Sequence, residues 1–281
     1  GELTLGGNTT WDGSTIAGSG TAKIKNESGK TFSATADGTI TGSVTFTNEG
    51  NFEKTSGATG GATDIQSKFD NSGTVSIGAG KLKLTGGGTS TGNVSVTGTL
   101  ELSGTDYAFN GGTLNGAGSI DLLSATTTFN AVTSNTTFKV NGGNAKFDGT
   151  NVGGGKLNLT AGTVTGSGTA DFSSLDWSGG NLDAKVKSTG NTTISGAGTK
   201  SLAGELTLGG NTTWDGSTIA GSGTAKIKNE SGKTFSATAD GTITGSVTFT
   251  NEGNFEKTSG ATGGATDIQS KFDNSGTVSI G

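Results

Sequence analysis

Apolar and polar residues alternate along many short stretches of this chain. The apolar pairs that show the alternation are Leu3 and Leu5, Val44 and Phe46, Val75 and Ile77, Leu82 and Leu84, Val94 and Val96, Leu100 and Leu102, and Leu157 and Leu159. A period of two puts successive side chains on opposite faces of a strand, so these stretches predict short strands with one buried face. Gly, Asn, Asp, Ser and Thr fill the intervals, which is typical of turns. No long stretch has a period of 3.6, and we expect no helix of consequence.

A much longer pattern is superimposed on the alternation. Residues 1–78 return without a single change as residues 204–281, at an offset of 203 residues. A fixed period decides the architecture before any local pattern does. We therefore expect one full long repeat, residues 1–203, followed by the first part of an identical long repeat, residues 204–281, which continues the first. The period also predicts that this chain is a window of a longer array.

A shorter period lies inside the long repeat. The stretch Ile16–Ile24 (IAGSGTAKI) has close counterparts in residues 114–122 and 164–172. A second series places an Asn and a Gly after a strand and advances by a similar step. Short strands and Gly turns with a period of roughly 20 to 25 residues predict an all-β chain folded as a single-stranded β-solenoid, or parallel β-helix. Its coils would stack at about 4.8 Å and bury a continuous apolar column.

The composition agrees with a folded β protein and excludes several classes. Glycine accounts for 55 of the 281 residues and proline is absent, which excludes collagen. Hydrophobic residues make up only 28%, but the net charge is just −5 and the apolar residues are strictly patterned, so disorder is the weaker interpretation. The negative charge and the lack of arginine argue against nucleic acid as a partner. No apolar run approaches the roughly 20 residues that span a bilayer.

Three stretches resemble a known group of proteins. They are Asn8–Ile24 (NTTWDGSTIAGSGTAKI), Leu175–Val186 (LDWSGGNLDAKV) and Phe69–Gly88 (FDNSGTVSIGAGKLKLTGGG). They are similar to the Gly/Thr-rich β-helix repeats of large secreted bacterial surface proteins, in particular filamentous-haemagglutinin-like proteins and autotransporter passengers. The resemblance implies secretion, an extracellular or cell-surface location, a right-handed β-helix, and a role in adhesion or surface structure.

The sequence offers no clear catalytic constellation. Polysaccharide-processing enzymes on a β-helix need converging carboxylates, and the acidic residues here are thinly spread, with Asp171, Asp176 and Asp183 as one of the denser groups. We expect these three to lie at turns and strand faces. His and Cys are absent, which excludes Ser–His and Cys–His nucleophiles. We predict no catalytic residues and no enzymatic activity.

Metal and cofactor sites are also not predicted. The calcium nonapeptide of β-rolls requires an Asp shortly after its glycines, and the runs 86–88 and 153–155 lack it. No EF-hand loop is present. Sparse calcium at stacked Asp turns stays open as an alternative.

Two residue types have competing interpretations. Trp11, Trp177 and Trp214 either fill the core or stack on sugars at the surface, and we favour the core because Trp buries a large apolar area in a chain that has little of it. Asn48 and Asn71 precede the same kind of Gly turn one short repeat apart. If the coils stack, their amides would form a hydrogen-bonded ladder between layers.

These observations predict a structural segment of a long extracellular fibre or surface stalk. Its main partner would be identical repeats of itself, either covalently continuous or associated end to end. The alternative is a repetitive adhesin rod that binds glycan or matrix with avidity. A polysaccharide-processing enzyme and an ice- or mineral-binding surface are more distant alternatives.

Overall fold

The protein is a parallel β-solenoid. The computed structural model describes residues 1–149 and 152–281, and these residues form strands, turns and loops without a helix. They fall into two compact units, Gly1–Phe138 (unit 1) and Lys139–Gly281 (unit 2), which together make about 14 turns. No helix among them is long and apolar enough to cross a membrane. The expected all-β solenoid is confirmed.

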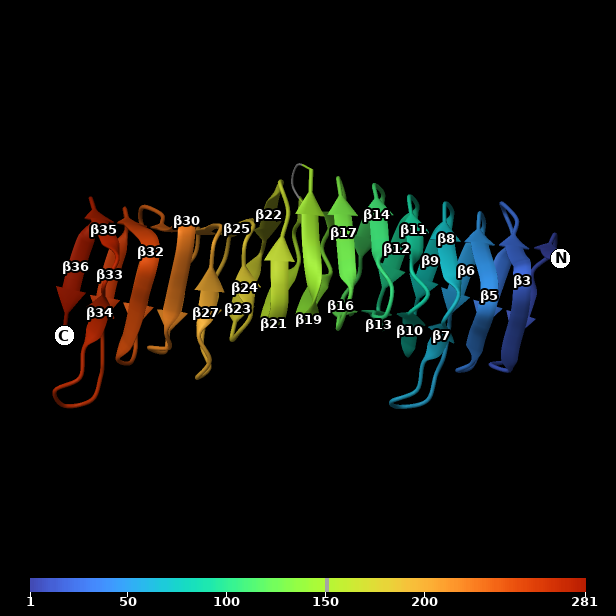
Figure 1. The fold of residues 1–281 in the computed structure, drawn as a ribbon, viewed down its shortest axis with the longest axis horizontal. Coiled ribbons are helices and arrows are strands. Elements are labelled where there is room, and N and C mark those ends of the chain that lie inside the picture. The colour runs from blue at the N-terminus through green and yellow to red at the C-terminus, as the bar shows by residue number, and fades with distance from the viewer. Residues whose placement is uncertain (150–151) are drawn as a thin grey trace. The chain divides into compact units, whose positions relative to one another are not determined.

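Unit 1 is built from short strands joined by tight turns (Figure 1). Its strands are β1 (Glu2–Leu5), β2 (Thr9–Trp11), β3 (Thr15–Asn26), β4 (Thr31–Ala34), β5 (Thr39–Asn48), β6 (Asn51–Lys54), β7 (Thr63–Ile65), β8 (Lys68–Asn71), β9 (Thr74–Ile77), β10 (Lys81–Leu84), β11 (Gly88–Ser90), β12 (Asn93–Val96), β13 (Thr99–Leu102), β14 (Tyr107–Asn110), β15 (Thr113–Asn115), β16 (Ser119–Leu122), β17 (Thr126–Asn130) and β18 (Thr133–Ser134).

Unit 2 follows the same plan. Its strands are β19 (Thr137–Asp148, which begins at the end of unit 1), β20 (Val152–Gly153), β21 (Lys156–Thr165), β22 (Thr169–Phe172), β23 (Ser174–Trp177), β24 (Asn181–Leu182), β25 (Lys185–Ser188), β26 (Thr192–Ile194), β27 (Lys200–Leu202), β28 (Glu205–Leu208), β29 (Thr212–Trp214), β30 (Ile219–Asn229), β31 (Thr234–Ala237), β32 (Gly241–Asn251), β33 (Asn254–Lys257), β34 (Thr266–Ile268), β35 (Lys271–Asn274) and β36 (Thr277–Ile280).

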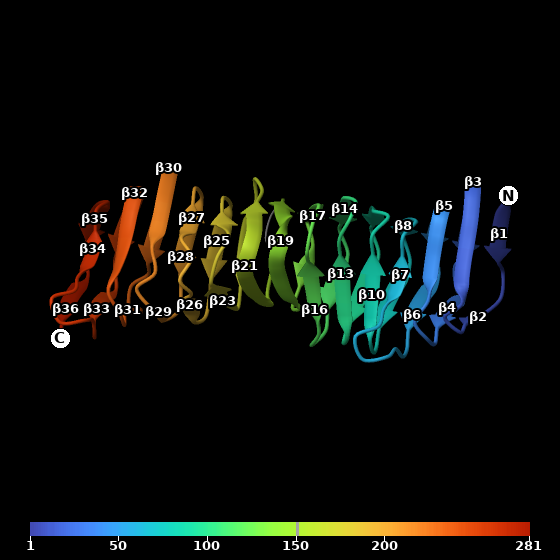
Figure 2. The ribbon, with the colours of Figure 1, turned by 60° about the horizontal axis from the view of Figure 1, so that its bottom comes forward.

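Each coil, meaning one turn of the solenoid, contributes strands to three parallel ladders. In unit 1, β7, β8 and β9 form one coil, and β10, β11 and β12 lie on them in the next. The third ladder of this unit is β2–β4–β6–β9–β12–β15–β18, and its strands β2, β4 and β6 lie along the lower side in Figure 2. Within each unit, parallel pairing between neighbouring coils satisfies backbone N–H and C=O groups of the described strands.

The coils bury a column of aromatic and aliphatic side chains. Phe32, Phe46, Phe52 and Phe69 come from four different strands and are at most 2% exposed. Their ring centroids lie 5.2 to 5.7 Å apart, and several pairs meet edge to face. This geometry adds to the hydrophobic gain of burial. The apolar residues of the alternating stretches therefore point into the core.

Coil length varies more than the sequence patterns indicate. Ala170 pairs in register with Val186, which makes a short coil, whereas Ile40 pairs with Ile65, which makes a much longer one. The long coil carries an extended loop, residues 55–62, which projects from the strands between β6 and β7 in Figure 1. A solenoid tolerates such insertions because only the strands, and not the turns, need to match between layers.

Some backbone positions accept only glycine. Gly42 has φ +84°, and a Cβ at this position would lie 2.0 Å from the carbonyl oxygen of Gly18 in the neighbouring coil. The backbones of adjacent coils thus approach too closely for any side chain.

Candidate functional site

The three tryptophans are core residues. Trp11 is 5% exposed, and Trp177 and Trp214 have no exposed surface. The indole Nε1 of Trp11 donates to Ser14 O at 2.9 Å, and that of Trp214 donates to Ser217 O at 2.8 Å. Trp177 Nε1 is buried without a partner. Among the described residues no aromatic side chain is largely exposed, so the sugar-stacking interpretation of the tryptophans is wrong.

The acidic residues of the sequence prediction do not gather on one ladder. Asp171 lies on β22, opposite Lys187 of β25. Asp176 lies on β23 and forms an ion pair with Lys156 of β21, while Asp183 follows β24. In the part of the chain that the structure describes, no group of three or more Asp or Glu side chains could hold a metal ion.

The asparagine ladder is present. Asn26 Nδ2 donates to Asn48 Oδ1 at 2.8 Å, Asn48 Nδ2 donates to Asn71 Oδ1 at 2.7 Å, and Asn71 Nδ2 donates to Ser90 Oγ at 3.0 Å. All four side chains are buried. The same amides also donate to backbone carbonyls, such as that of Thr74 at 2.9 Å from Asn48. The prediction for Asn48 and Asn71 is confirmed, and the ladder locks neighbouring turns together.

The ladder recurs in the second long repeat and begins in the same way. Asn229 Nδ2 donates to Asn251 Oδ1 at 2.8 Å, and Asn251 Nδ2 donates to Asn274 Oδ1 at 2.7 Å. Oδ1 of Asn229 is buried without a partner because its register neighbour on β28 is Leu208, which has no donor in its side chain. The unpaired Oδ1 of Asn229 shows that the ladder begins at this residue.

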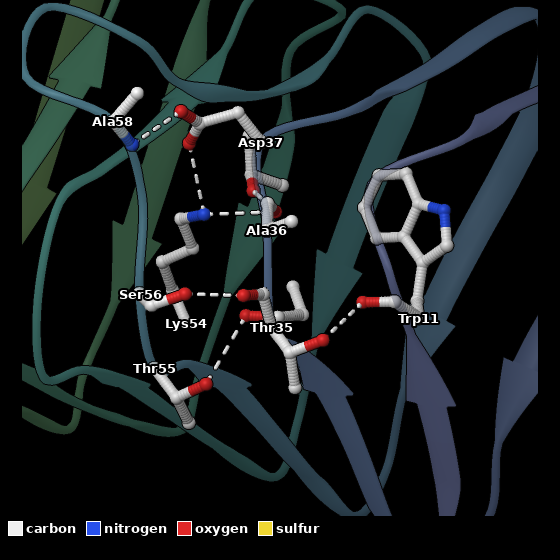
Figure 3. A network of polar contacts seen from close by, with 10 residues as sticks. Trp11, Thr35, Ala36, Asp37, Lys54, Thr55, Ser56 and Ala58 are labelled. Atoms are coloured by element: carbon white, nitrogen blue, oxygen red, sulfur yellow. Dashed lines mark hydrogen bonds and ion pairs between the residues drawn. The ribbon is translucent and has the colours of Figure 1, made fainter.

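A buried ion pair lies at the centre of a polar cluster in unit 1 (Figure 3). Lys54 ends β6 at an inward position, and its side chain has no exposed surface. Its ammonium donates to Ala36 O at 2.9 Å and to Asp37 Oδ1 at 3.0 Å. The other carboxylate oxygen, Asp37 Oδ2, accepts the Ala58 N–H at 2.8 Å. The cluster thus connects strand β6, the turn after β4 and the loop that contains Ala58.

That loop, residues 55–62, is held at its base and exposed at its tip. Thr55 Oγ1 donates to Ala34 O at 3.4 Å, and Ser56 Oγ donates to Thr35 O. The Asp37 carboxylate packs so closely on Gly61 that a Cβ there would lie 2.1 Å from Oδ2. Residues 55–60 are exposed. A side chain at position 61 would therefore displace the carboxylate from its present position.

Two opposing effects act on Asp37. Desolvation raises the pKa of this carboxyl, but the hydrogen bonds from Lys54 and from the Ala58 N–H, together with the positive charge of Lys54, lower it by more. The pKa of Asp37 therefore lies below its usual value, and the carboxylate stays charged at neutral pH. A charged, doubly bonded carboxylate anchors the loop rather than exchanging protons.

Unit 2 contains the corresponding ion pair, with a lysine side chain that is 15% exposed. Lys257 Nζ lies 2.9 Å from Asp240 Oδ1, and Asp240 Oδ2 accepts the Ala261 N–H at 2.7 Å. The hydrogen bond from Lys257 lowers the pKa of Asp240 as well. The loop of residues 258–265 projects between β33 and β34 in Figure 1.

Sequence reasoning missed this cluster, although a signal was present. In the stretch Asn51–Lys54 (NFEK), Lys54 takes the inward position two residues after Phe52. A lysine at an apolar position of the alternation predicts a buried ammonium, and a buried ammonium requires a partner. The partner, Asp37, comes 17 residues earlier in the chain and cannot be assigned without the register of the coils.

Each unit also has a shallow polar groove. In unit 1 a groove of ≈ 600 Å³ crosses several coils and is lined by Lys23, Gln66, Lys68, Thr85 and Thr105 among others. Lys23 and Lys68 lie on either side of the same β5 residue in register, one from each neighbouring coil. Hydroxyl, amide and ammonium groups can donate hydrogen bonds to a polar ligand.

The groove of unit 2 is smaller and carries both charges. It has a volume of ≈ 350 Å³ and is lined in part by Asp183, Lys185, Glu205 and Lys226. Lys185, Glu205 and Lys226 follow one another in register on β25, β28 and β30. Charge alternates along this ladder, so neighbouring coils attract one another at their outer surface.

Comparison with known proteins identifies no relatives of this chain. No family model, no curated protein and no solved structure matches this chain. The fold itself defines the class: the chain is a β-helix repeat protein with parallel coils and long tandem repeats.

Proposed function

We propose that this chain is a structural segment of a long extracellular fibre or surface stalk built from tandem identical β-solenoid repeats. The observation that carries the proposal is that the repeated sequence forms the same contacts twice. The Trp–Ser bond, the asparagine ladder and the Lys–Asp cluster of residues 1–78 all recur in residues 204–281. A repeat that forms the same contacts in each copy is suited to lengthening a solenoid by the addition of further copies.

The distribution of polar groups supports a structural role. The buried polar residues described above connect successive coils, as in the ladder from Asn26 to Ser90 and the pair Lys54–Asp37. A solenoid layer cannot bury its apolar face alone and gains stability from each neighbour. Adding repeats therefore lengthens the structure while preserving every contact between layers.

The resemblance to filamentous-haemagglutinin-like proteins and autotransporter passengers supports a place for the fibre outside the cell. We propose secretion and a cell-surface location on that resemblance. The chain has no cysteine, so its coils are held by hydrogen bonds and packing instead of disulfides.

The proposal is tested with single chains that contain one, two and three copies of the long repeat. Small-angle X-ray scattering and negative-stain electron microscopy would measure their maximum dimension. We expect each added repeat of about ten coils to lengthen the particle by roughly 40–50 Å at constant width. A maximum dimension that grows only as the cube root of mass would overturn the proposal.

The adhesin alternative has one feature in its favour, the groove of unit 1. It offers Lys23, Gln66 and Lys68 to an acidic glycan, but no exposed aromatic side chain of the described residues accompanies them. Binding of acidic and neutral polysaccharides to the chain, and to its Lys23→Ser variant, tests this alternative. Loss of binding to an acidic polysaccharide in the variant would favour the adhesin.

A further inference from the structure

We infer that the loop of residues 55–62 is a processing site for an endopeptidase whose substrate pocket accepts small side chains. The bond that is cut joins Ala58 to Thr59, and its counterpart in the second long repeat joins Ala261 to Thr262. Hydrolysis consumes one water molecule and leaves a carboxylate on Ala58 and an amino group on Thr59. The inference goes beyond the fibre function and does not depend on it.

The loop offers an enzyme a long exposed segment in the middle of unit 1. Residues 55–60 are six consecutive exposed residues, the longest such run among the described residues of this unit. The strands on either side of the loop, β6 and β7, each pair with a coil on both sides, so the loop lies within the stack of coils and not at its end. Exposed loop tips made of small and polar residues are preferred sites of proteolytic cleavage.

Opening of the loop tip breaks few hydrogen bonds. The Ala58 N–H donates to Asp37 Oδ2 at 2.8 Å (Figure 3), and the Gly61 N–H donates to Ala58 O at 3.0 Å. The flanking strands are part of the parallel ladders, so opening them would break a coil. Cleavage of a folded protein follows the population of its locally opened form when opening and closing are fast. The tip therefore opens, and is cut, at a lower cost in free energy than the strands of unit 1.

The sequence of the loop selects the class of endopeptidase. Residues 55–62 read TSGATGGA and contain no lysine, no arginine and no aromatic residue. Enzymes that require such a side chain find no site within the loop, and Lys54, which precedes it, has no exposed surface. A small S1 pocket, as in elastase, accepts alanine. Ala58 is the alanine at the exposed tip.

Another exposed loop shows what distinguishes this site. Residues 196–199 of unit 2 are also exposed and include Ala197. There the ammonium of the buried Lys200 donates to Gly196 O and, at 2.8 Å, to Gly198 O. Lys200 thus holds the backbone on both sides of the alanine. We expect this second loop to resist cleavage, although it has the same kind of side chain to offer.

A cut at the tip leaves the solenoid connected. Strands β5 and β6 precede the cut, and β7, β8 and β9 follow it, yet the two groups pair with each other. Phe46 lies opposite Phe69, and Phe52 lies opposite Val75, so both sides of the cut share one buried core. The ladders and the core therefore hold the cut chain together without the covalent bond.

The site recurs with the long repeat. In each copy the tip is a turn with glycine third, and Gly60 and Gly263 have φ of +82° and +78°. Both turns are closed by a hydrogen bond from the fourth residue to the first, which in the second copy joins the Gly264 N–H to Ala261 O at 2.8 Å. Cleavage of both copies therefore produces a fragment of one full period, residues 59–261.

Limited digestion with pancreatic elastase, followed by mass spectrometry of the products, tests the site. We expect the first cuts of the folded chain to fall after Ala58 and Ala261, with residues 59–261 as a product. First cuts after Ala197 or within the strands, or a folded chain that elastase leaves intact, would overturn the inference.

Thr59→Pro is the matched variant. A turn with a negative φ at its second residue and a positive φ at a glycine in its third accepts proline second, and Thr59 holds that second position. Because proline has no N–H and a fixed φ, the bond before it is a poor substrate. We expect cleavage after Ala58 to be lost and cleavage after Ala261 of the same molecule to continue. Cleavage after Ala58 at the parent rate would overturn the assignment of the bond.

Asp37→Asn tests the anchor of the tip. Without the charged acceptor of the Ala58 N–H, we expect cleavage after Ala58 to become several-fold faster and cleavage after Ala261 to keep its rate. Equal rates in the variant and the parent would overturn the role of Asp37.

Size-exclusion chromatography of the cut chain tests its cohesion. Thr262→Pro confines cleavage to the first loop, and we expect residues 1–58 and 59–281 to elute together until denaturant is added. Separate elution without denaturant would overturn the conclusion that the coils hold the cut chain together.

Discussion

The ammonium of Lys54 lies 3.0 Å from Asp37 Oδ1, and the lysine side chain that carries it has no exposed surface. The pair connects β6 to the turn after β4 and, through the Ala58 N–H, to the projecting loop. A charge in this position must be paired, because desolvation of a lone ammonium costs several kcal/mol. The pair therefore determines both the position of the loop and the tolerance of the site to substitution.

Replacing Asp37 with alanine should destabilise unit 1 strongly. Lys54 would stay buried without its carboxylate, which we expect to cost about 3 kcal/mol, the lower end for a broken buried pair because Asp37 is partly exposed. Local free energies of opening from hydrogen exchange in β4 and β6 would measure the loss. Glu49→Ala is the matched control: it breaks the pair Lys25–Glu49, which lies at the surface, and should have little effect. Equal costs would contradict the assignment.

Acid should release the loop of residues 55–62. The pKa of Asp37 is lowered in the folded protein, so its contribution to stability is present above the unfolded value of about 3.9 and is lost as pH falls through the lower folded value. We expect the protection factor of the Ala58 amide to be constant from neutral pH down to about pH 4 and to fall below it. The Asp37→Asn variant should lack this transition. A transition near neutral pH in the parent would be inconsistent with the lowered pKa.

The middle of the asparagine ladder should matter more than its end. Asn48→Ala removes one of the acceptors of Asn26 Nδ2 and leaves the buried Asn71 Oδ1 without its donor. We expect the loss of both ladder bonds to cost about 2–4 kcal/mol. Asn26→Ala disturbs only one neighbour in the ladder, because Oδ1 of Asn26 has no partner. Its cost should be smaller by about 1 kcal/mol or more. Denaturant titrations of the two variants compare them, and the opposite order would refute the ladder as a stabilising device.

The two fully buried tryptophans should respond differently to the same substitution. Trp214→Phe removes the hydrogen bond from Nε1 to Ser217 O, whereas Trp177→Phe removes an N–H that has no partner. Both variants lose similar apolar area, so the difference between them reports the hydrogen bond, which we expect to be about 1–2 kcal/mol. Thermal unfolding of unit 2 measures the difference. Equal destabilisation would show that Trp177 Nε1 is bonded in solution.

Local patterns were sufficient to predict the fold. Alternation at pairs such as Leu82 and Leu84 predicted strands with one buried face, and both residues are buried in unit 1. The recurring Asn–Gly turns predicted the ladder of Asn48 and Asn71. Both signals are local, because a strand needs only its own period of two and a turn needs only its own residues.

The charged contacts between coils could not be predicted, because they depend on more than local signals. The pairing of Lys54 with Asp37, and of Asp176 with Lys156, depends on the length of each coil, which varies along the chain. An error of one residue in register reverses the face of every side chain. The sequence could therefore indicate the kinds of residues that stack, but it could not place charged partners on adjacent layers.

The most direct test of the fibre function is cryo-electron microscopy of a single chain that contains several long repeats. We predict uniform thin filaments of one chain, with a layer line near about 4.8 Å along the filament axis and a longer axial period set by the long repeat. Compact particles, or filaments whose strands run along the axis instead of across it, would contradict the account.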